Sequence, residues 1–316
     1  MGNTKNYTDM RDAFFGELYL LALNDRNVIL IHGDQGALIF KDFKKNIPAQ
    51  IINGGIAEQN LISVAAGLAL GGKKVFVHAI ASFLTLRCYE QIKVDLSMMN
   101  LPVTLVGIGA GYAYGDAGPT HHAVQDLSIL RAIPKMMILN ASDTVSLSNF
   151  CRIAYENTGG PLYVRFDKAN IPQIYTDETK FSEGLARIRN GRDLTIISTG
   201  LMVHRALEIA NALNLYGIKT EVIDIYRIKP INCSLLANIL ANCEKIITLE
   251  EHGPIGGLGS LISEFLCDYR LHIPLKRIAL EDSNCFIYGT RDYVHREMGL
   301  DKDNLTANIY EWSRNL

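Results

Sequence analysis

Hydrophobic positions along the chain follow two alternating spacings. Short runs of apolar and β-branched residues, typical of buried strands, occupy 28–32, 50–53, 74–78, 102–107, 136–140, 194–198, 220–225 and 245–250. Segments with apolar residues at helical spacing lie between them, at 9–26, 58–70, 83–99, 126–133, 203–215, 233–241 and 259–269. Thr8 or Asp9 can cap the first of these helices. Because strands that are apolar on both faces need cover on both sides, the alternation predicts an α/β fold of mainly parallel sheets covered by helices.

The alternation is interrupted in one segment. Residues 172–183 are polar and carry no clear period, which is typical of a linker. A chain of 316 residues is also long enough for two domains, at a usual ~100 to 200 residues each. We therefore predict two successive α/β domains, at residues 1–175 and 188–316, joined by a linker over 176–187. The second domain is the smaller one.

Composition and charge narrow the classes of partner. Hydrophobic residues make up 48% of the chain and charged residues 20%, as in ordinary folded soluble proteins. The net charge of −2 provides no basic field, so neither nucleic acid nor an anionic membrane is expected as a partner. No apolar run approaches the ~20 residues of a membrane span and the N-terminus is too polar for a signal peptide, so a cytoplasmic location is expected. The six cysteines include no CxxC pair, so neither a disulfide framework nor a zinc site is indicated.

Three loops that follow predicted strands carry polar residues suited to chemistry, and in parallel sheets such loops form the ligand crevice. They are residues 53–60, 115–122 and 159–165, and the last of these is predicted as a short strand that ends in an arginine. Each also has a purely structural interpretation. Glu58 can be a charge at a helix N-terminus, His121 and His122 can be an exposed loop pair, and Arg165 can be a salt-bridge partner.

These loops belong to a series of longer motifs. GIAEQN and an AAGLA helix are followed by four further motifs along the chain: SFLTLRCYEQIK at 82–93, GPTHHAVQDLSILRAIPKM at 118–136, GPLYVR at 160–165 and EEHGPIGGLGS at 250–260. In this order and spacing they resemble the thiamine diphosphate enzymes of the transketolase and deoxyxylulose phosphate synthase group. The resemblance runs from about residue 8 to near the end of the chain. It implies a pyrimidine-binding domain followed by the smaller transketolase C-terminal domain.

The resemblance also implies a partner. Full-length transketolases begin with a domain that binds the cofactor diphosphate through Mg²⁺, held by a GDG motif and a downstream asparagine. This sequence starts after that domain, and GDQG at 33–36 lies in the first loop of the pyrimidine domain instead. The C-terminal subunit of a split transketolase is implied, with a separate N-terminal subunit that supplies the diphosphate and metal site. The helix over 58–70 is apolar nearly all round, as expected of a domain core or of a homodimer contact within an α2β2 assembly.

Family positions imply roles in cofactor binding. Glu58 matches the glutamate that protonates the aminopyrimidine ring of thiamine diphosphate, and a carboxyl in a dry pocket suits this role because burial favours its neutral form. Phe83 and Tyr89 match aromatic positions that line the aminopyrimidine. Leu86 stands where many transketolases carry another aromatic residue at this ring.

Other positions imply contacts to a small sugar substrate. His121 matches the histidine of the GxTH motif, which exchanges a proton with the developing alkoxide. Arg11 and Arg165 match arginines that hold a substrate phosphate. Asp116 is a candidate for reading a substrate hydroxyl, since the family's aspartate is replaced at the next position.

Three positions depart from the family pattern. Gly109 replaces a histidine, Ala117 replaces the hydroxyl-reading aspartate, and Leu38 replaces a phosphate-site serine. Transfer of a two-carbon ketol unit from a ketose phosphate to an aldose is the first interpretation. Decarboxylating acyl transfer from a 2-oxoacid such as pyruvate, as in deoxyxylulose phosphate synthase, stays open. The GPTHH loop argues against a 2-oxoacid dehydrogenase β subunit, and the retained catalytic positions argue against a noncatalytic regulatory partner.

Overall fold

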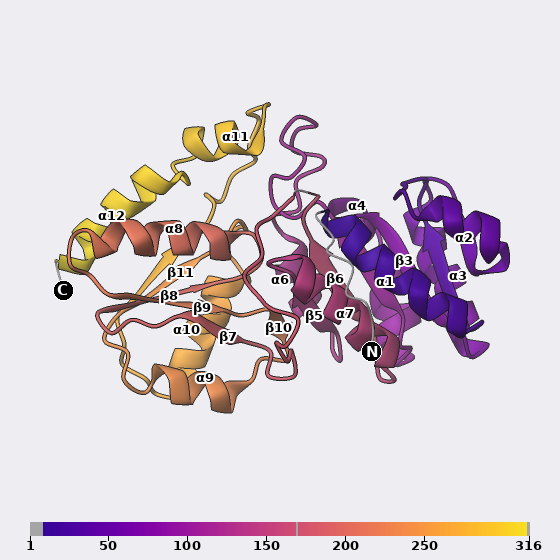
Figure 1. Ribbon diagram of the computed structural model, residues 1–316, viewed down its shortest axis with the longest axis horizontal. Helices are drawn as coiled ribbons and strands as arrows, with labels where there is room; N and C mark the ends of the chain where they lie inside the picture. The colour runs from indigo at the N-terminus through magenta and orange to yellow at the C-terminus, as the bar shows by residue number, and fades with distance from the viewer. Residues whose placement is uncertain (1–8, 169, 315–316) are drawn as a thin grey trace.

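The computed structural model describes residues 9–168 and 170–314, which form two α/β domains side by side (Figure 1). The first domain is built on a seven-stranded sheet in the order β10-β5-β6-β4-β3-β1-β2, in which every pairing except that of β10 is parallel. Its strands are β1 (Val28–His32), β2 (Ile51–Asn53), β3 (Lys74–Ile80), β4 (Thr104–Ile108), β5 (Met137–Asn140), β6 (Leu162–Phe166) and β10 (Arg227–Lys229).

Helices cover both faces of this sheet because its strands are apolar on both faces. Successive residues of β1 enter different hydrophobic clusters: Leu30 packs with α1 and α7, whereas Ile31 packs with α3, α4 and α6. The helical elements of this domain are α1 (Met10–Asn24), α2 (Phe40–Asn46), η1 (Pro48–Gln50), α3 (Glu58–Leu70), α4 (Ala81–Thr85), α5 (Tyr89–Gln91), η2 (Ile92–Met98), α6 (Asp126–Arg131) and α7 (Thr144–Glu156). Asp9 caps α1 by accepting hydrogen bonds from the Arg11 and Asp12 N–H groups, while Thr8 lies outside the described residues.

The second domain repeats the plan on a smaller scale. Its five-stranded sheet has the order β12-β11-β8-β9-β7, and only β7 runs antiparallel to its neighbour. Its elements are β7 (Ala186–Arg189), β8 (Leu194–Ser198), α8 (Met202–Asn214), β9 (Thr220–Asp224), α9 (Cys233–Leu240), β11 (Ile246–Leu249), α10 (Leu258–Asp268), β12 (Leu275–Ile278), α11 (Arg291–Glu297) and α12 (Lys302–Arg314). The predicted fold class is confirmed. No helix in the described part of the chain is long and apolar enough to cross a membrane.

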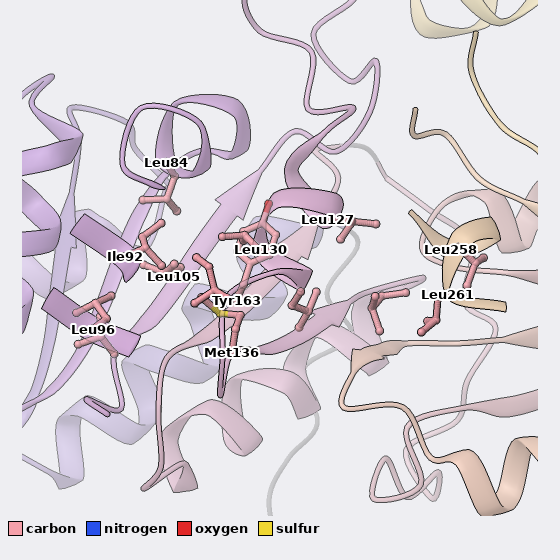
Figure 2. Packing of buried hydrophobic residues seen from close by; sticks show 14 of the residues in the cluster. Leu84, Ile92, Leu96, Leu105, Leu127, Leu130, Met136, Tyr163, Leu258 and Leu261 are labelled. Carbon is pink, nitrogen blue, oxygen red and sulfur yellow. The ribbon is translucent and has the colours of Figure 1, made fainter. Parts of the chain in front are cut away.

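The two domains share a hydrophobic core. Leu258 and Leu261 of α10 lie in the same buried cluster as Leu127 and Leu130 of α6, and Figure 2 shows these side chains facing one another across the junction. Strand β10, which comes from the second half of the chain, pairs with β5 at the edge of the first sheet. The domains are therefore joined through packing and through main-chain hydrogen bonds.

The polar segment 172–183, which overlaps the predicted linker, is part of this junction. Tyr175 and Phe181 are buried in the core of the first domain, and the N–H groups of Ile174 and Tyr175 both donate to Asp143 at 2.8 Å. Strand β7 begins at Ala186, so the last two residues predicted as linker already belong to the second sheet. The polar composition of residues 172–183 did not indicate that Tyr175 and Phe181 are buried in the core.

The helix predicted over 83–99 is interrupted. The structure divides it into α4, the short α5 and the π-helix η2. Thr85 Oγ1 donates to the Ala81 carbonyl at 2.7 Å and Cys88 Sγ donates to the Phe83 carbonyl at 3.6 Å, so side chains compete for main-chain acceptors here. Breaks of this kind often occur at functional sites. Several elements were not predicted from the sequence, namely α2, α7, α11, α12, β7, β10 and β12.

Candidate active site

A buried carboxyl at the start of α3 forms one end of the site. Glu58 is the first residue of that helix, directly after the loop that follows β2, and it is only 3% exposed. Its Oε2 atom accepts a hydrogen bond from Arg87 Nη1 at 3.0 Å. Arg87 lies in the break between α4 and α5, so the carboxyl faces that break and not open solvent.

An aromatic ring connects this carboxyl to the glycine-rich loop. Phe83 of α4 lies beneath the Arg87 guanidinium, whose central carbon is 4.4 Å from the ring centroid. The His121 ring approaches the same Phe83 ring edge-on, with 4.9 Å between centroids. Glu58, Phe83 and His121 follow β2, β3 and β4, so the carboxyl ends of three parallel strands converge as predicted for a ligand crevice.

The His121 imidazole is oriented by its own loop. Its Nδ1 atom lies 3.0 Å from Thr120 Oγ1, so this hydrogen bond does not involve Nε2. Its neighbour His122 is buried against Tyr112, with ring centroids 4.7 Å apart, and burial lowers the pKa of His122. The two adjacent histidines therefore separate into a core residue and a site residue.

Sequence reasoning missed two residues beside His121. The Tyr114 ring lies 5.9 Å from the His121 ring, and the Lys168 ammonium lies 4.2 Å from the centre of Tyr114. A side chain at Gly109, whose φ is +91°, would come within 2.2 Å of Tyr114. Tyr114 thus fills the space beside Gly109, the glycine that replaces the family's histidine. That replacement was the signal in the sequence that could have pointed to Tyr114.

Two predicted substrate residues lie near Tyr114. Burial raises the pKa of Tyr114, the Arg11 charge opposes that rise, and Asp167 and Asp116 reinforce it. Arg11 is also 3.5 Å from Asp9 at the start of α1. Asp116 is exposed on the loop. The charges of Arg11 and Asp116 therefore act on Tyr114, the ring that lies beside His121.

The two remaining cofactor positions flank the break after α4. Leu86 is 46% exposed. Tyr89 is half-buried and lines a cavity of about 530 Å³ together with Gln125, Ser128 and Gly256. Beneath them, burial and the nearby Glu58 raise the pKa of the Cys88 thiol to about 12, so this thiol stays neutral.

Arg165 is the predicted site residue that the structure places elsewhere. Its guanidinium is buried at the domain junction, where Nε donates to Asp126 Oδ2 at 2.8 Å and Nη2 donates to the Ala123 carbonyl at 2.9 Å. Tyr163 donates to the same Asp126 oxygen at 2.8 Å. The salt-bridge interpretation of Arg165 is the one that its contacts support. Lys168 is instead the cation of this segment that lies beside the His121 loop.

The second domain supports the glycine-rich loop. The Gly289 N–H donates to the Gly115 carbonyl at 3.2 Å, and a side chain at Gly118, with φ of +79°, would come within 2.5 Å of the Tyr288 ring. Arg291 at the start of α11 donates to the Ala110 carbonyl at 2.7 Å. In Figure 1 the loop between β4 and α6 rises beside α11.

The site as a whole offers a carboxyl, a flat aromatic face, an imidazole and cations for an anionic ligand. The Arg87 guanidinium, a planar group with N–H donors, contacts both Glu58 and Phe83, and a planar ring with nitrogen atoms, such as the aminopyrimidine of thiamine diphosphate, has the same contact chemistry. Among the described residues no group of three or more His, Cys, Asp or Glu side chains is arranged to hold a metal ion.

Comparison with known proteins identifies the family of this chain. Residues 6–173 match the family described as transketolase, pyrimidine binding domain, and residues 184–305 match transketolase, C-terminal domain. One of the subunits of the apulose-4-phosphate transketolase of Phocaeicola vulgatus is 34% identical, over 97% of this chain and 98% of its own. The 1-deoxy-D-xylulose-5-phosphate synthase of Chlorobaculum tepidum is 33% identical, over 94% of this chain but 47% of its own. A solved structure described as "Split gene transketolase, inactive beta4 tetramer" is 30% identical with a TM-score of 0.84, and the match covers 96% of this chain and 97% of that one.

Proposed function

The chain belongs to the transketolase family, and from that premise we propose that it is the C-terminal subunit of a two-component, thiamine diphosphate-dependent transketolase. Membership makes it a transferase, so the alternative of a noncatalytic regulator is set aside. The observation that carries the finer proposal is the convergence of Glu58, Phe83 and His121 at the ends of three parallel strands.

Thiamine diphosphate, when bound, supplies the nucleophilic carbon that accepts the two-carbon unit. Glu58 holds a proton at the ring nitrogen of the aminopyrimidine, and its burial keeps water from competing for that hydrogen bond. Phe83, Leu86 and Tyr89 provide apolar contacts to the faces of the ring. His121 exchanges a proton with the substrate oxygen through Nε2, because Nδ1 is engaged by Thr120.

The substrate we propose is a ketose that carries an anionic group. The named relatives act on, or make, sugar phosphates, and this chain has cations on the His121 side of the site. Lys168 lies over Tyr114, and the charge of Arg11 acts on the same ring. Because Ala117 cannot contact a substrate hydroxyl, we propose that the exposed Asp116 or the Tyr114 hydroxyl takes that contact.

A separate subunit completes the enzyme in this proposal. It holds the cofactor diphosphate and Mg²⁺, for which the described residues of this chain offer no cluster of ligands. The similar protein described as an inactive β4 tetramer supports the idea that such subunits assemble with themselves when alone. We propose a homodimer of this chain within an α2β2 enzyme.

Reconstitution tests the proposal. The purified chain alone is expected to show no turnover and weak binding of thiamine diphosphate. Addition of an N-terminal transketolase subunit of about 270 residues, encoded beside this chain and carrying a GDG motif, should restore Mg²⁺-dependent ketol transfer from a ketose phosphate to an aldose. Turnover by the isolated chain would contradict the split architecture.

A second candidate chemistry is decarboxylating transfer from pyruvate. Gly109 and Ala117 lack the side chains that transketolases use on their sugars, and the similarity to 1-deoxy-D-xylulose-5-phosphate synthase favours this alternative. Incubation of the reconstituted pair with pyruvate and an aldose phosphate distinguishes the two reactions, because decarboxylating transfer releases CO₂ and ketol transfer does not.

A further inference from the structure

Arg87 makes the two contacts that the proposed function assigns to the cofactor. Its guanidinium donates to Glu58 at 3.0 Å, and the central carbon of the guanidinium lies over the Phe83 ring, 4.4 Å from the ring centroid. We propose that Arg87 holds the place of the aminopyrimidine in the cofactor-free chain and leaves that place when thiamine diphosphate binds. The inference rests on the proposed function and adds a residue to which the family motifs assign no role.

The two groups compete because they are chemically alike. A guanidinium is planar and delocalised, presents an N–C–N edge with N–H donors to a carboxylate, and stacks on aromatic rings. An aminopyrimidine also presents a planar N–C–N edge and an aromatic face. The Phe83 face and the Oε2 atom of Glu58 cannot serve both groups at once, so occupation by one displaces the other.

Arg87 is free to leave, whereas Glu58 is not. The Arg87 side chain is 44% exposed and stands in the break between α4 and α5, where a flexible stem can swing toward solvent. Glu58 is held at the first position of α3 and its side chain is 3% exposed. The exchange therefore needs only a side-chain rotation of Arg87.

Pairing with Arg87 stabilises the buried Glu58 while the subunit has no cofactor bound. A buried carboxylate without a partner is strongly unfavourable, and removal of one member of a buried pair destabilises the fold. Arg87 supplies the partner until the cofactor does. Because the competent state is then only a fraction of the population, the apparent affinity for the cofactor is lowered by that fraction.

Cofactor titration tests this inference. Thiamine diphosphate is titrated at saturating Mg²⁺ into the complex of this chain with its N-terminal partner, for the wild type and for Arg87→Ala, Arg87→Lys and Arg152→Ala. The last is a matched control, since Arg152 is a half-exposed arginine that donates to the buried Glu17 at 2.7 Å in the same domain. The melting temperature of each cofactor-free chain is measured in parallel.

Arg87→Ala is expected to bind thiamine diphosphate about three- to tenfold more tightly, because a competitor is removed. Arg87→Lys should fall between Ala and wild type, since lysine keeps the charge but cannot stack as a plane. Arg152→Ala should lower the melting temperature and leave the cofactor Kd unchanged. If Arg87→Ala folds poorly, Arg87→Gln replaces it.

Unchanged or weaker cofactor binding in the Arg87 variants would overturn the inference, because Arg87 would then act on the bound cofactor or not at all. Failure of the wild-type complex to bind thiamine diphosphate would overturn the inference together with the proposed function. The two failures are distinguished by the wild-type titration alone.

Discussion

Glu58 and Glu17 are both buried carboxylates paired with a more exposed arginine in the first domain. Their surroundings differ. Glu17 joins α1 to α7 through Arg152, whereas Glu58 lies beside a ring that also contacts His121. Burial and pairing alone therefore do not define a catalytic carboxyl. The neighbouring aromatic ring and imidazole are what distinguish Glu58, our proposed catalytic carboxyl, from Glu17.

Glu58→Gln is expected to lower kcat of the reconstituted enzyme by more than tenfold, which corresponds to more than about 1.4 kcal/mol in the barrier. The amide cannot pass a proton to the aminopyrimidine nitrogen. Circular dichroism of the variant should stay native. Glu17→Gln is the matched control and should keep its rate, and retention of more than a tenth of the rate by Glu58→Gln would make Glu58 a helix-end charge.

Asp224 shows how a buried acid couples stability to pH. Its Oδ2 atom accepts hydrogen bonds from Ser142 Oγ at 2.7 Å and Tyr175 OH at 2.8 Å, which ties the second sheet to the first domain and to the polar segment 172–183. Burial raises the pKa of Asp224 to about 7, against these two hydrogen bonds, which lower it. The folded protein therefore keeps a proton that the unfolded chain releases near pH 4.

The sign of this linkage predicts the behaviour of Asp224→Asn. Between pH 5 and 7 the folded state binds more protons than the unfolded state, so the contribution of Asp224 to stability falls as the pH rises. The free energy of unfolding of the wild type, relative to Asp224→Asn, should drop by on the order of 2 kcal/mol between pH 5 and pH 8. Urea unfolding at three pH values measures it.

Asp301→Asn is the control for this titration. Burial acts to raise the pKa of Asp301, but hydrogen bonds from Asn304 and Asp303 outweigh burial and hold this pKa below its ordinary value. Its effect on stability should therefore be constant from pH 5 to pH 8. A flat difference for Asp224→Asn as well would show that Asp224 is ionised throughout.

At the scale of elements, α11 connects the second domain to the site loop. Arg291 at its start pairs with Asp167 at the end of β6 and with Glu251 after β11, and His295 of the same helix contacts Glu251. Burial acts to raise the pKa of Glu251, but Arg291 and His295 outweigh burial and hold this pKa well below its ordinary value. Because Arg291 also donates to the Ala110 carbonyl, this short helix joins the segments after β4, β6 and β11, which are distant in the sequence.

Arg291→Met is expected to cost about 3–5 kcal/mol of unfolding free energy, because it leaves the carboxylates of Glu251 and Asp167 buried without this guanidinium. Urea denaturation measures the loss. Arg296→Met on the exposed side of the same helix should change stability by less than about 0.5 kcal/mol. Equal effects of the two substitutions would mean that the ion pairs contribute nothing to stability.

At the scale of the whole molecule, one face of the first domain has apolar residues in solvent. Val64 of α3 is 40% exposed, and Met98 of the neighbouring η2 is 72% exposed. Ser63 and Asp95 join these two elements by a hydrogen bond of 2.7 Å. Helix α3 thus packs in the core on one side, and on the other it exposes Val64 among polar residues such as Asn60 and Ser63, so it is less apolar all round than the sequence suggested. We place the proposed homodimer contact on this exposed side.

Light scattering of the isolated chain should give at least twice its mass of 35.1 kDa, since an obligate dimer buries ~2,000 Å² or more. Val64→Glu should shift the population toward the monomer without loss of helical content. Leu215→Glu, at an 86% exposed position of the second domain, should leave the mass unchanged. A wild-type mass near 35 kDa would reject the arrangement.

The amino-acid sequence by itself determined the alternating strands and helices, the two domains, the family motifs and the positions of Glu58, Phe83 and His121. These features depend on local spacing, because periods of 2 and 3.6 residues and short motifs are complete within a few turns of chain. The tertiary structure decided which neighbours each residue has. Glu58 and Arg87 are separated by 29 positions, and Arg165 and Asp126 by 39.

Only the fold could therefore reveal that Arg87 lies over Phe83, that Tyr114 lies beside His121 with Lys168 over its ring, and that Arg165 forms a buried ion pair. The physical reason is that the role of a charged side chain depends on its distance to other charges and on its exposure. Both quantities arise when strands distant in sequence pack side by side. A sequence pattern records the residue type but not these surroundings.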